Sequence, residues 1–242
     1  SSDFASPWRE THSSEKRIFD CDAVSRKRIR IIFRICGDKV NAAFDRRTRR
    51  GGCAMKAILC EEFGPPDLLQ LREVDAPELR AGQVRIRVEA CGVNFPESLI
   101  IQNKYQFKAE LPFTPGGEVA GVVDAVGDGV TDFHPGDTVM AMALTGGYAE
   151  QIVVDQDAIM PRPKAMPSKI AAGFTMTYGT SMHALKQRAK LAKGETLLVL
   201  GAGGGVGLAA VEIGKAMGAT VIAAASSQEK LDAAKRAGAD FG

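Results

Sequence analysis

The glycine-rich run GAGGGVG at residues 201–207 constrains the fold of this chain more than any other feature. It lies between a short apolar segment, TLLVL at 196–200, and a segment of helical period at 208–217. A short apolar run is typical of a strand buried on both faces of a parallel sheet. A strand, a glycine-rich turn and a helix in this order begin a nucleotide-binding βαβ unit. We therefore expect a dinucleotide at this turn; an ordinary tight turn is the alternative.

The residues after the glycine-rich run repeat the alternation of strand and helix. The apolar segment TVIAAA at 220–225 is a second candidate buried strand, and SSQEKLDAAKRAG at 226–238 has helical period. Ser226 and Glu229 have the spacing of a capping box at the start of that helix. We expect residues 164–242 to hold one or two bridging helices and then the first half of a doubly wound parallel sheet.

The spacing within the glycine-rich run is Ala202-x-Gly204-x-x-Gly207, with alanine at the first position of the usual G-x-G-x-x-G pattern. We expect Gly204 to let the backbone approach a pyrophosphate and Gly207 to let the helix pack closely on the strand. Backbone N–H groups at the helix start would face the phosphates. The candidate cofactor-binding residues at this turn are Ala202, Gly204, Gly205, Val206 and Gly207.

The end of the second strand indicates which dinucleotide is bound. An NAD site usually has Asp or Glu there, which accepts a hydrogen bond from the ribose 2′-hydroxyl. This chain has Ser226 and Ser227, with Lys230 one turn later. Two hydroxyls and an ammonium can bind a 2′-phosphate, and no carboxylate repels it, so these residues favour NADP. The alternative is that Ser226 only caps the helix and Lys230 is a solvated surface charge.

Residues 55–163 have a different pattern, in which short apolar runs are broken by glycine and proline. Such runs, spaced closely and separated by turn residues, predict a compact antiparallel barrel-like domain. The candidate strands are 55–62, 68–75, 83–94, 118–127, 137–143 and 148–155.

The first 54 residues differ from the rest in charge. Residues 1–54 carry 13 Lys/Arg and 7 Asp/Glu, a net of +6, whereas residues 55–242 carry 18 and 22, a net of −4. We expect this basic leader to be disordered or not native to the protein, such as upstream or mis-framed translated sequence. An interaction arm or a targeting peptide is the alternative. Few aromatics for base stacking and seven acidic residues argue against these two.

Composition excludes several classes of protein. The chain is 45% hydrophobic and 25% charged, which does not fit a disordered protein. No run of about 18 apolar residues offers a membrane span. Its five cysteines form no C-x-x-C pair, so neither a disulfide framework nor a zinc knuckle is indicated, and we expect a cytoplasmic location.

Four ordered segments resemble the medium-chain dehydrogenase/reductase superfamily, and within it the zinc-independent quinone oxidoreductase branch. They are ACGVNFPESLIIQNKY (90–105), LPFTPGGEVAGVVDAVG (111–127), FHPGDTVM (133–140) and GGYAEQIVV (146–154). The resemblance covers 55–242 and does not touch 1–54. It implies an α/β protein with an N-terminal GroES-like β-barrel domain and the first half of a Rossmann sheet. It also implies a C-terminal truncation, because the chain stops just before a third strand is expected.

The resemblance also implies that no metal is bound. Zinc alcohol dehydrogenases have ligand residues at the positions that match Asn94 and Gly117, and neither an amide nor a glycine replaces the Cys, His or carboxylate that zinc requires.

Three residues are candidates for a role at the reacting atoms because they match family positions. Asn94 could donate a hydrogen bond to the substrate carbonyl or the nicotinamide ribose; a turn residue that satisfies local backbone is the alternative. Tyr105, in Gln102-Asn103-Lys104-Tyr105, could deliver a proton as a general acid, or it could be only an aromatic lid. Thr177 matches a position near the nicotinamide and is a candidate cofactor-binding residue.

The resemblance thus predicts NADPH-dependent hydride transfer to a quinone or an α,β-unsaturated carbonyl without zinc. The alternatives are an enoyl-thioester reductase of the acryloyl-CoA type and a non-catalytic NADPH-binding protein. The expected partner is a small-molecule quinone or enone, with no nucleic acid and no membrane, and the full-length protein could form a homodimer.

Overall fold

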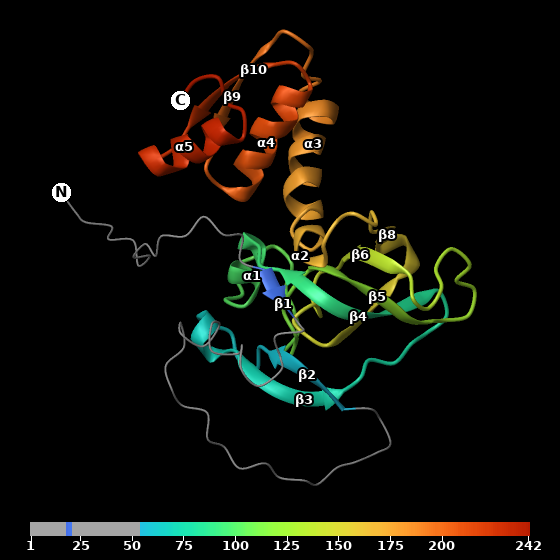
Figure 1. Cartoon of the computed structure of the whole chain (residues 1–242). Helices are drawn as coiled ribbons and strands as arrows, with labels where there is room; N and C mark the ends of the chain where they lie inside the picture. Colours follow the sequence, from blue (N-terminus) through green and yellow to red (C-terminus); the bar gives the residue numbers. More distant parts are fainter. Residues whose placement is uncertain (1–17, 21–53) are drawn as a thin grey trace, which may run out of the picture.

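The computed structural model describes residues 54–242 and the backbone of Ile18–Asp20 (Figure 1). The expectations for the rest of the basic leader lie outside the described residues. The described chain forms two units joined by a helical segment: the lower unit in Figure 1 is built of antiparallel strands and the upper one of parallel strands and helices. No helix in this part of the chain is long and apolar enough to cross a membrane.

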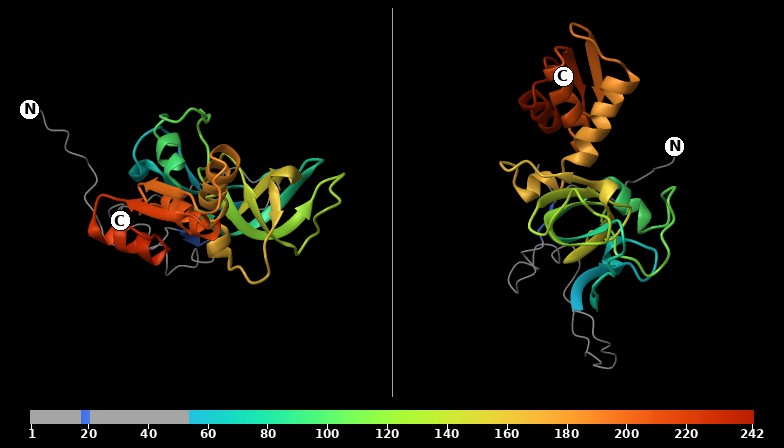
Figure 2. Two further views of the ribbon diagram at one scale, coloured as in Figure 1. Left: turned by 90° about the horizontal axis from the view of Figure 1, so that it is seen from above. Right: turned by 90° about the vertical axis from the view of Figure 1, so that its right-hand side faces the viewer.

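The lower unit is the antiparallel barrel that the sequence predicts. Its main sheet has the order β1-β4-β5-β6-β8, with β7 paired to β4, and it curves strongly in the right-hand view of Figure 2. Its strands are β1 (Ile18–Asp20), β4 (Gln83–Gly92), β5 (Glu118–Val126), β6 (Thr138–Met142), β7 (Gln151–Asp155) and β8 (Ile159–Pro161). Alternate residues of β4 face the core, where Val84, Ile86 and Val88 are at most 3% exposed.

A separate hairpin extends the barrel. Strands β2 (Ala54–Leu59) and β3 (Gln70–Asp75) pair antiparallel, and Ala57 and Cys60 bridge the hairpin to Ala149 and Phe113 of the barrel. Two single turns of 3-10 helix occur at Pro66–Leu68 and Gln156–Ala158. The short helix α1 (Phe95–Ile100), which the sequence analysis does not predict, follows β4 directly.

A helical segment carries the chain from the barrel to the upper unit. It consists of α2 (Ser168–Ala171), η5 (Thr175–Gly179), α3 (Thr180–Met182) and η6 (His183–Arg188), as expected for one or two bridging helices. Stretches η5 and η6 have the wider π spacing, and at the end of η6 the N–H of Ala189 donates to the carbonyl of Ala184 five residues back. Two side-chain contacts attach this segment to α4: the Tyr178 hydroxyl donates to Glu212, and the Ser181 hydroxyl donates to the Val206 carbonyl.

The upper unit is the β-α-β-α arrangement that the sequence predicts. Strands β9 (Thr196–Leu200) and β10 (Thr220–Ala224) pair parallel, and helices α4 (Gly205–Ala216) and α5 (Gln228–Arg236) follow them. The third strand begins earlier than expected, because Phe241 already lies in a parallel bridge with Ile222. The N–H of Ala223 also donates to the Phe241 carbonyl.

The prediction that β9 is buried on both faces is wrong. Val199 is buried, but Leu198 is 57% and Leu200 is 76% exposed. Both α4 and α5 pack on one face of the sheet, together with the buried residues Val199, Val211, Val221 and Ala234. No described element covers the other face, so the apolar residues on that side of β9 stay exposed.

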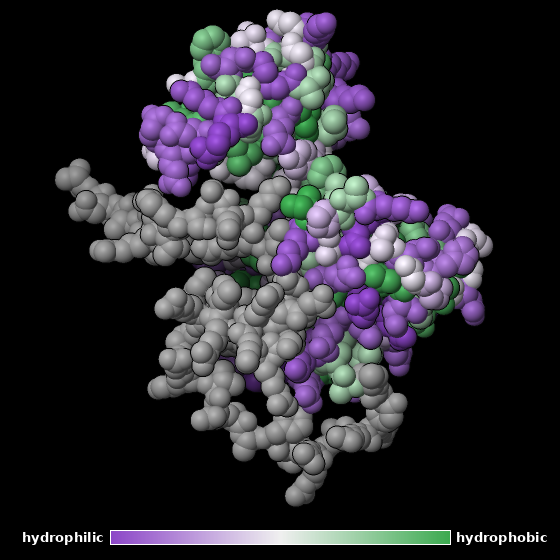
Figure 3. Space-filling view, in the orientation of Figure 1, coloured by the Kyte–Doolittle hydropathy of each residue, from purple (hydrophilic) through white to green (hydrophobic). Residues whose placement is uncertain are grey.

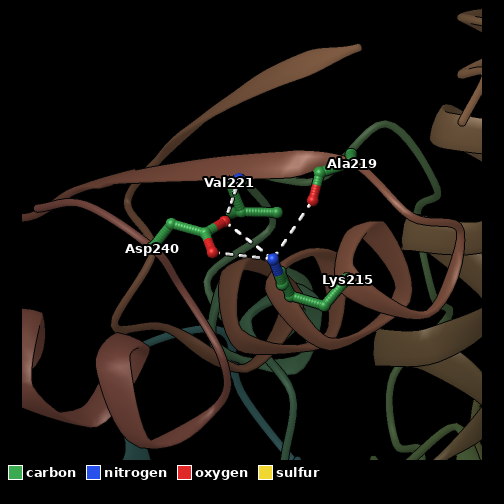
Figure 4. A network of polar contacts seen from close by, with 4 residues as sticks. All are labelled: Lys215, Ala219, Val221 and Asp240. Carbon is green, nitrogen blue, oxygen red and sulfur yellow. Dashed lines mark hydrogen bonds and ion pairs between the residues drawn. The ribbon is translucent and has the colours of Figure 1, made fainter. Parts of the chain in front are cut away.

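An ion pair holds the start of the third strand against β10 (Figure 4). Lys215 Nζ donates to both carboxylate oxygens of Asp240, at 2.8 Å each, and the backbone N–H of Val221 donates to the same carboxylate at 2.7 Å. The bond from Lys215, aided by that from Val221, lowers the pKa of Asp240 below its usual value.

Asp240→Asn is therefore expected to destabilise the upper unit at neutral pH. A carboxyl whose folded pKa is lowered stabilises the fold above the unfolded pKa, and this stabilisation is lost as pH falls through the folded value. The difference in unfolding free energy between wild type and variant should shrink as pH falls below 3.8, the usual value. Denaturant unfolding at several pH values measures this difference in free energy. A difference that does not change with pH would contradict the role of the Asp240 carboxylate in the ion pair with Lys215.

Candidate functional site

The glycine-rich turn brings a helix N-terminus to the end of β9. Gly201 has a φ of +67°, a left-handed conformation that favours glycine, and Gly204 precedes the first residue of α4. The first N–H groups of a helix have no intrahelical acceptor. At the start of α4 these are the N–H groups of Gly205, Val206 and Gly207. These donors, with the helix dipole, suit an anionic ligand.

Two glycines of the turn differ in the space around them. A Cβ atom at Gly207 would lie 2.3 Å from the Gly201 carbonyl oxygen and 2.8 Å from Ala202 Cα, so α4 contacts the turn too closely for any side chain. A Cβ atom at Gly204 would meet only one atom, at 3.5 Å. The turn is thus packed at Gly207 and open at Gly204, which is the distribution that a bound pyrophosphate requires.

Ala202 and Thr177 border the turn. Ala202 is fully buried, and its N–H donates to the Ala224 carbonyl at the end of β10. The Thr177 methyl group would lie 3.1 Å from a Cβ atom at Gly205, so η5 contacts the start of α4. The Thr177 hydroxyl donates to the Gly173 carbonyl at 2.9 Å, a bond within its own helical segment.

The first turn of α5 places Lys230 beside the glycine-rich turn. A Cβ atom at Gly203 would lie 2.5 Å from Lys230 Cβ, so the stem of this lysine packs on the glycine. Lys230 Nζ donates to Ser226 Oγ at 3.2 Å. Lys230 and Ser226 are both exposed and adjacent to the first residues of the turn.

The predicted capping box of Ser226 and Glu229 is wrong. Helix α5 begins at Gln228, and its N-cap is Ser227, whose side chain accepts from the Lys230 N–H at 3.4 Å. Ser227 has extended backbone angles, so the helix begins one residue later than the sequence pattern indicates. Ser226 is therefore not the cap, and its hydroxyl is paired with Lys230 instead.

An open hollow of about 470 Å³ lies beside the glycine-rich turn. Apolar residues from the bridging segment, β9 and α4 line it together with the turn itself: Leu185, Leu197 to Gly201, Gly204 to Gly207, and Ala210. The free edge of β9 and the helix N-terminus thus border one concave surface, which matches the place where ligands bind in open α/β sheets.

Asn94 lies in a buried polar network between the barrel and the bridging segment. It precedes α1, and its side-chain Nδ2 donates to Glu118 Oε2 at 3.0 Å. Glu118 Oε1 accepts from the backbone N–H of Met176, next to Thr177, at 2.9 Å. Glu97 Oε2 accepts from the Asn94 N–H at 2.9 Å, and its Oε1 accepts from the Gly117 N–H at 3.1 Å. This network joins the barrel to η5.

Burial raises the pKa of the Glu97 carboxyl, and the N–H donors of Gly117 and Asn94 oppose the rise. A carboxyl with a raised folded pKa binds its proton more tightly in the native state. Its contribution is most favourable below the usual value of 4.5 and declines as pH rises through the folded pKa.

Glu97→Gln should remove this dependence on pH. Wild type is expected to lose stability relative to the variant as pH rises from about 4 to about 7, since only wild type must ionise the buried Glu97 carboxyl. Unfolding free energies of the two proteins across that range test the point. Two curves with a constant separation would show that Glu97 is not the titrating group.

Tyr105 lies apart from this network. It is half-buried and packs with Phe63, Leu69 and Phe107 on an apolar cluster that contains Ile100 and Phe113. Its described contacts are thus with apolar side chains. Its role as a proton donor remains a prediction.

Glu97 and Glu118 are not among the site residues predicted from the sequence. Glu97 is 6% and Glu118 is 1% exposed, which is unusual for charged residues. A signal was present in each case: Glu97 stands three residues after Asn94, the capping-box spacing, and Glu118 stands at the start of an apolar strand.

Family models match both units. One described as the alcohol dehydrogenase GroES-like domain covers residues 80–164, and one described as zinc-binding dehydrogenase covers residues 205–242. An antiparallel barrel followed by a parallel sheet with helices is the domain arrangement of the medium-chain dehydrogenase/reductase superfamily.

Three similar proteins indicate which branch of this superfamily the chain resembles. The quinone oxidoreductase of Mus musculus is 42% identical over 177 residues, which are 72% of this chain and 54% of that protein. A probable oxidoreductase from Mycobacterium abscessus has a TM-score of 0.74 and 40% identity, covering 78% of this chain and 61% of that one. The quinone oxidoreductase of Thermus thermophilus, also solved with NADPH, has a TM-score of 0.69 and 37% identity, covering 77% and 59%.

The chain therefore belongs to the quinone oxidoreductase branch of the medium-chain dehydrogenase/reductase superfamily, as the sequence motifs predict. It spans about half the length of the curated relatives that it matches.

Proposed function

We propose that the protein is an NADPH-dependent oxidoreductase that transfers hydride to a quinone or an α,β-unsaturated carbonyl without zinc. The observation that carries this proposal is the pairing of Lys230 with Ser226 beside the open helix N-terminus at Gly205. A 2′-phosphate needs a cation and a hydroxyl, and a pyrophosphate needs free N–H donors. Both sets of donors border one turn.

The residues present fit this cofactor. Gly204 leaves the space that a pyrophosphate would fill, and none of the residues from Ala225 to Gln228 at the end of β10 is a carboxylate. Gly205 to Gly207 would hold the pyrophosphate, and Ser226 and Lys230 would hold the 2′-phosphate. Bound there, NADPH supplies the hydride. The relatives named quinone oxidoreductase, and the Thermus thermophilus structure solved with NADPH, support the same cofactor and acceptor.

The residues of this chain then have to bind and orient the acceptor. Asn94 Nδ2 has a second hydrogen, besides the one given to Glu118, that can point toward an acceptor oxygen as negative charge develops there. Gly117, at a position that matches a zinc ligand, has no side chain and donates its N–H to Glu97. In the described residues, no group of three or more His, Cys, Asp or Glu side chains is placed to hold a metal ion. These features support a reaction in which no zinc takes part.

An acceptor panel tests the proposal. The chain is incubated with NADPH, a chelator and one acceptor at a time: a quinone, an enone, an enoyl-CoA thioester or a simple ketone. We expect reduction of the quinone and the enone, and none of the simple ketone. Exclusive reduction of the thioester would favour the enoyl-thioester reductase. NADPH binding without reduction of any acceptor would favour a non-catalytic binding protein.

Tyr105→Phe tests the proton donor separately. Phenylalanine keeps the packing on the apolar cluster but cannot deliver a proton to the substrate α-carbon. We expect enone reduction to fall by about 10²-fold, whereas quinone reduction falls less because water can protonate quinone oxygens. Steady-state rates with both acceptors measure the effect. Equal rates for variant and wild type with both acceptors would show that Tyr105 is not the proton donor.

A further inference from the structure

We propose that Glu118 is a positioning residue that orients the Asn94 amide and holds it at a fixed place relative to the cofactor side of the site. This inference rests on the proposed function. The carboxylate of Glu118 lies at the start of β5, is 1% exposed, and accepts hydrogen bonds from two elements at once. One donor is Asn94 Nδ2, before α1, and the other is the N–H of Met176 in η5.

The first bond sets which way the amide faces. A carboxylate offers only acceptors, so it pairs with the nitrogen of the Asn94 amide and not with its oxygen. The surroundings are fitted to this contact: a Cβ atom at Gly92 would lie 2.9 Å from Glu118 Oε2 and 2.3 Å from the Ala172 carbonyl oxygen. A glycine at this position is what lets the carboxylate, the amide and the helical segment approach one another.

The second bond connects this amide to the cofactor side. Met176 precedes Thr177, whose methyl group contacts Gly205 at the start of α4. A continuous series of contacts therefore runs from Asn94 through Glu118 and η5 to the glycine-rich turn. Through it, Glu118 holds the acceptor-binding amide at a fixed place relative to the start of α4.

Binding measurements with two ligands test this role. One ligand is the quinone, titrated with NADP⁺ present so that no hydride is transferred, and the other is NADPH alone. Glu118→Gln keeps the volume but replaces one acceptor with a donor, so the side chain can no longer accept from both Asn94 Nδ2 and the Met176 N–H. Because Asn94 donates to the acceptor oxygen, we expect quinone affinity to fall by about tenfold, the effect of one hydrogen bond to a bound ligand. The affinity for NADPH should be unchanged.

A double-mutant cycle shows whether Glu118 acts through Asn94. Asn94→Ala removes the amide, so adding Glu118→Gln to it should cause no further loss of quinone affinity. Glu150→Gln is the matched control, because Glu150 accepts from the Lys56 N–H in the barrel, away from the site, and it should bind like wild type.

Three results would overturn the inference: Glu118→Gln binding the quinone as wild type does, equal losses for the quinone and NADPH, or a further loss when Glu118→Gln is added to Asn94→Ala. Should Glu118→Gln fail to fold, Asn94→Ala, which leaves the bond between Glu118 and Met176 intact, must show the loss for the quinone alone. A wild-type chain that binds neither the quinone nor NADPH would overturn the proposed function itself, and with it this inference.

Discussion

Gly207→Ala is expected to lower the free energy of unfolding of the upper unit by about 1–3 kcal/mol, and Gly204→Ala to leave it unchanged. The reason is the difference in space at the two glycines. A methyl group at Gly207 meets backbone atoms at 2.3 and 2.8 Å, which cannot move without displacing α4 from the turn. A methyl group at Gly204 enters open space, with its nearest atom at 3.5 Å.

The same pair of variants should behave alike toward the cofactor. We expect both to weaken NADPH binding: Gly207→Ala because the helix N-terminus moves, and Gly204→Ala because its methyl group fills the space of the pyrophosphate. Denaturant unfolding and calorimetric titration of the two variants separate these effects. A Gly204→Ala variant that binds NADPH as tightly as wild type would show that the phosphates lie elsewhere.

Lys230→Glu is expected to reverse the preference between the two dinucleotides. The substitution replaces the ammonium beside Ser226 with a carboxylate, which repels a 2′-phosphate but can accept from a ribose 2′-hydroxyl. Charge-assisted hydrogen bonds are worth about 1.5–3 kcal/mol, so NADPH affinity should fall by about 10- to 100-fold. NADH affinity should stay the same or rise.

Lys235→Glu provides the matched control for this experiment. It makes the same change in net charge on the same helix but near the other end of α5, away from the glycine-rich turn. We expect its affinities for NADPH and NADH to keep the wild-type ratio. If Lys230→Glu weakened both dinucleotides equally, the lysine would act through general charge or helix stability, and the assignment of the 2′-phosphate site would be wrong.

Local sequence patterns predicted the parts of the fold that depend on local chemistry. The apolar run before GAGGGVG, and the helical period after it, identified β9 and α4 because a tight strand-to-helix turn needs glycine at defined positions. Within the predicted strand 83–94, now β4, Val84, Ile86 and Val88 alternate with charged residues, because one face of the strand is buried. Both patterns are set by a residue's immediate neighbours.

Features that depend on distant contacts were not predictable in this way. The exposure of Leu198 and Leu200 follows from the placement of α4 and α5 on one face of the sheet, which no pattern within β9 records. Glu118 stands among apolar residues in the sequence, and its partners Asn94 and Met176 are 24 and 58 positions away along the chain. Only the folded arrangement brings the three together.

The surface of the upper unit agrees with a small-molecule site at the turn. Figure 3 shows hydrophilic side chains over α5, and this helix contains Glu, Lys, Asp and Arg residues along its length. The exposed large apolar residues of this unit include Leu198 and Leu200 of β9 and Val206 at the start of α4, which line the hollow, and Phe241 near the C-terminus, which does not. The polar helix and the apolar hollow thus border the glycine-rich turn from different sides.

The central claim is that the strand, turn and helix from Thr196 to Ala216, with Ser226 and Lys230, form an NADPH site. Equilibrium titration of the unmodified chain with NADPH and with NADH, at one ionic strength, tests it most directly. We expect NADPH to bind about tenfold more tightly or better, at one molecule per chain. Equal affinities, tighter binding of NADH, or no binding of either would contradict it.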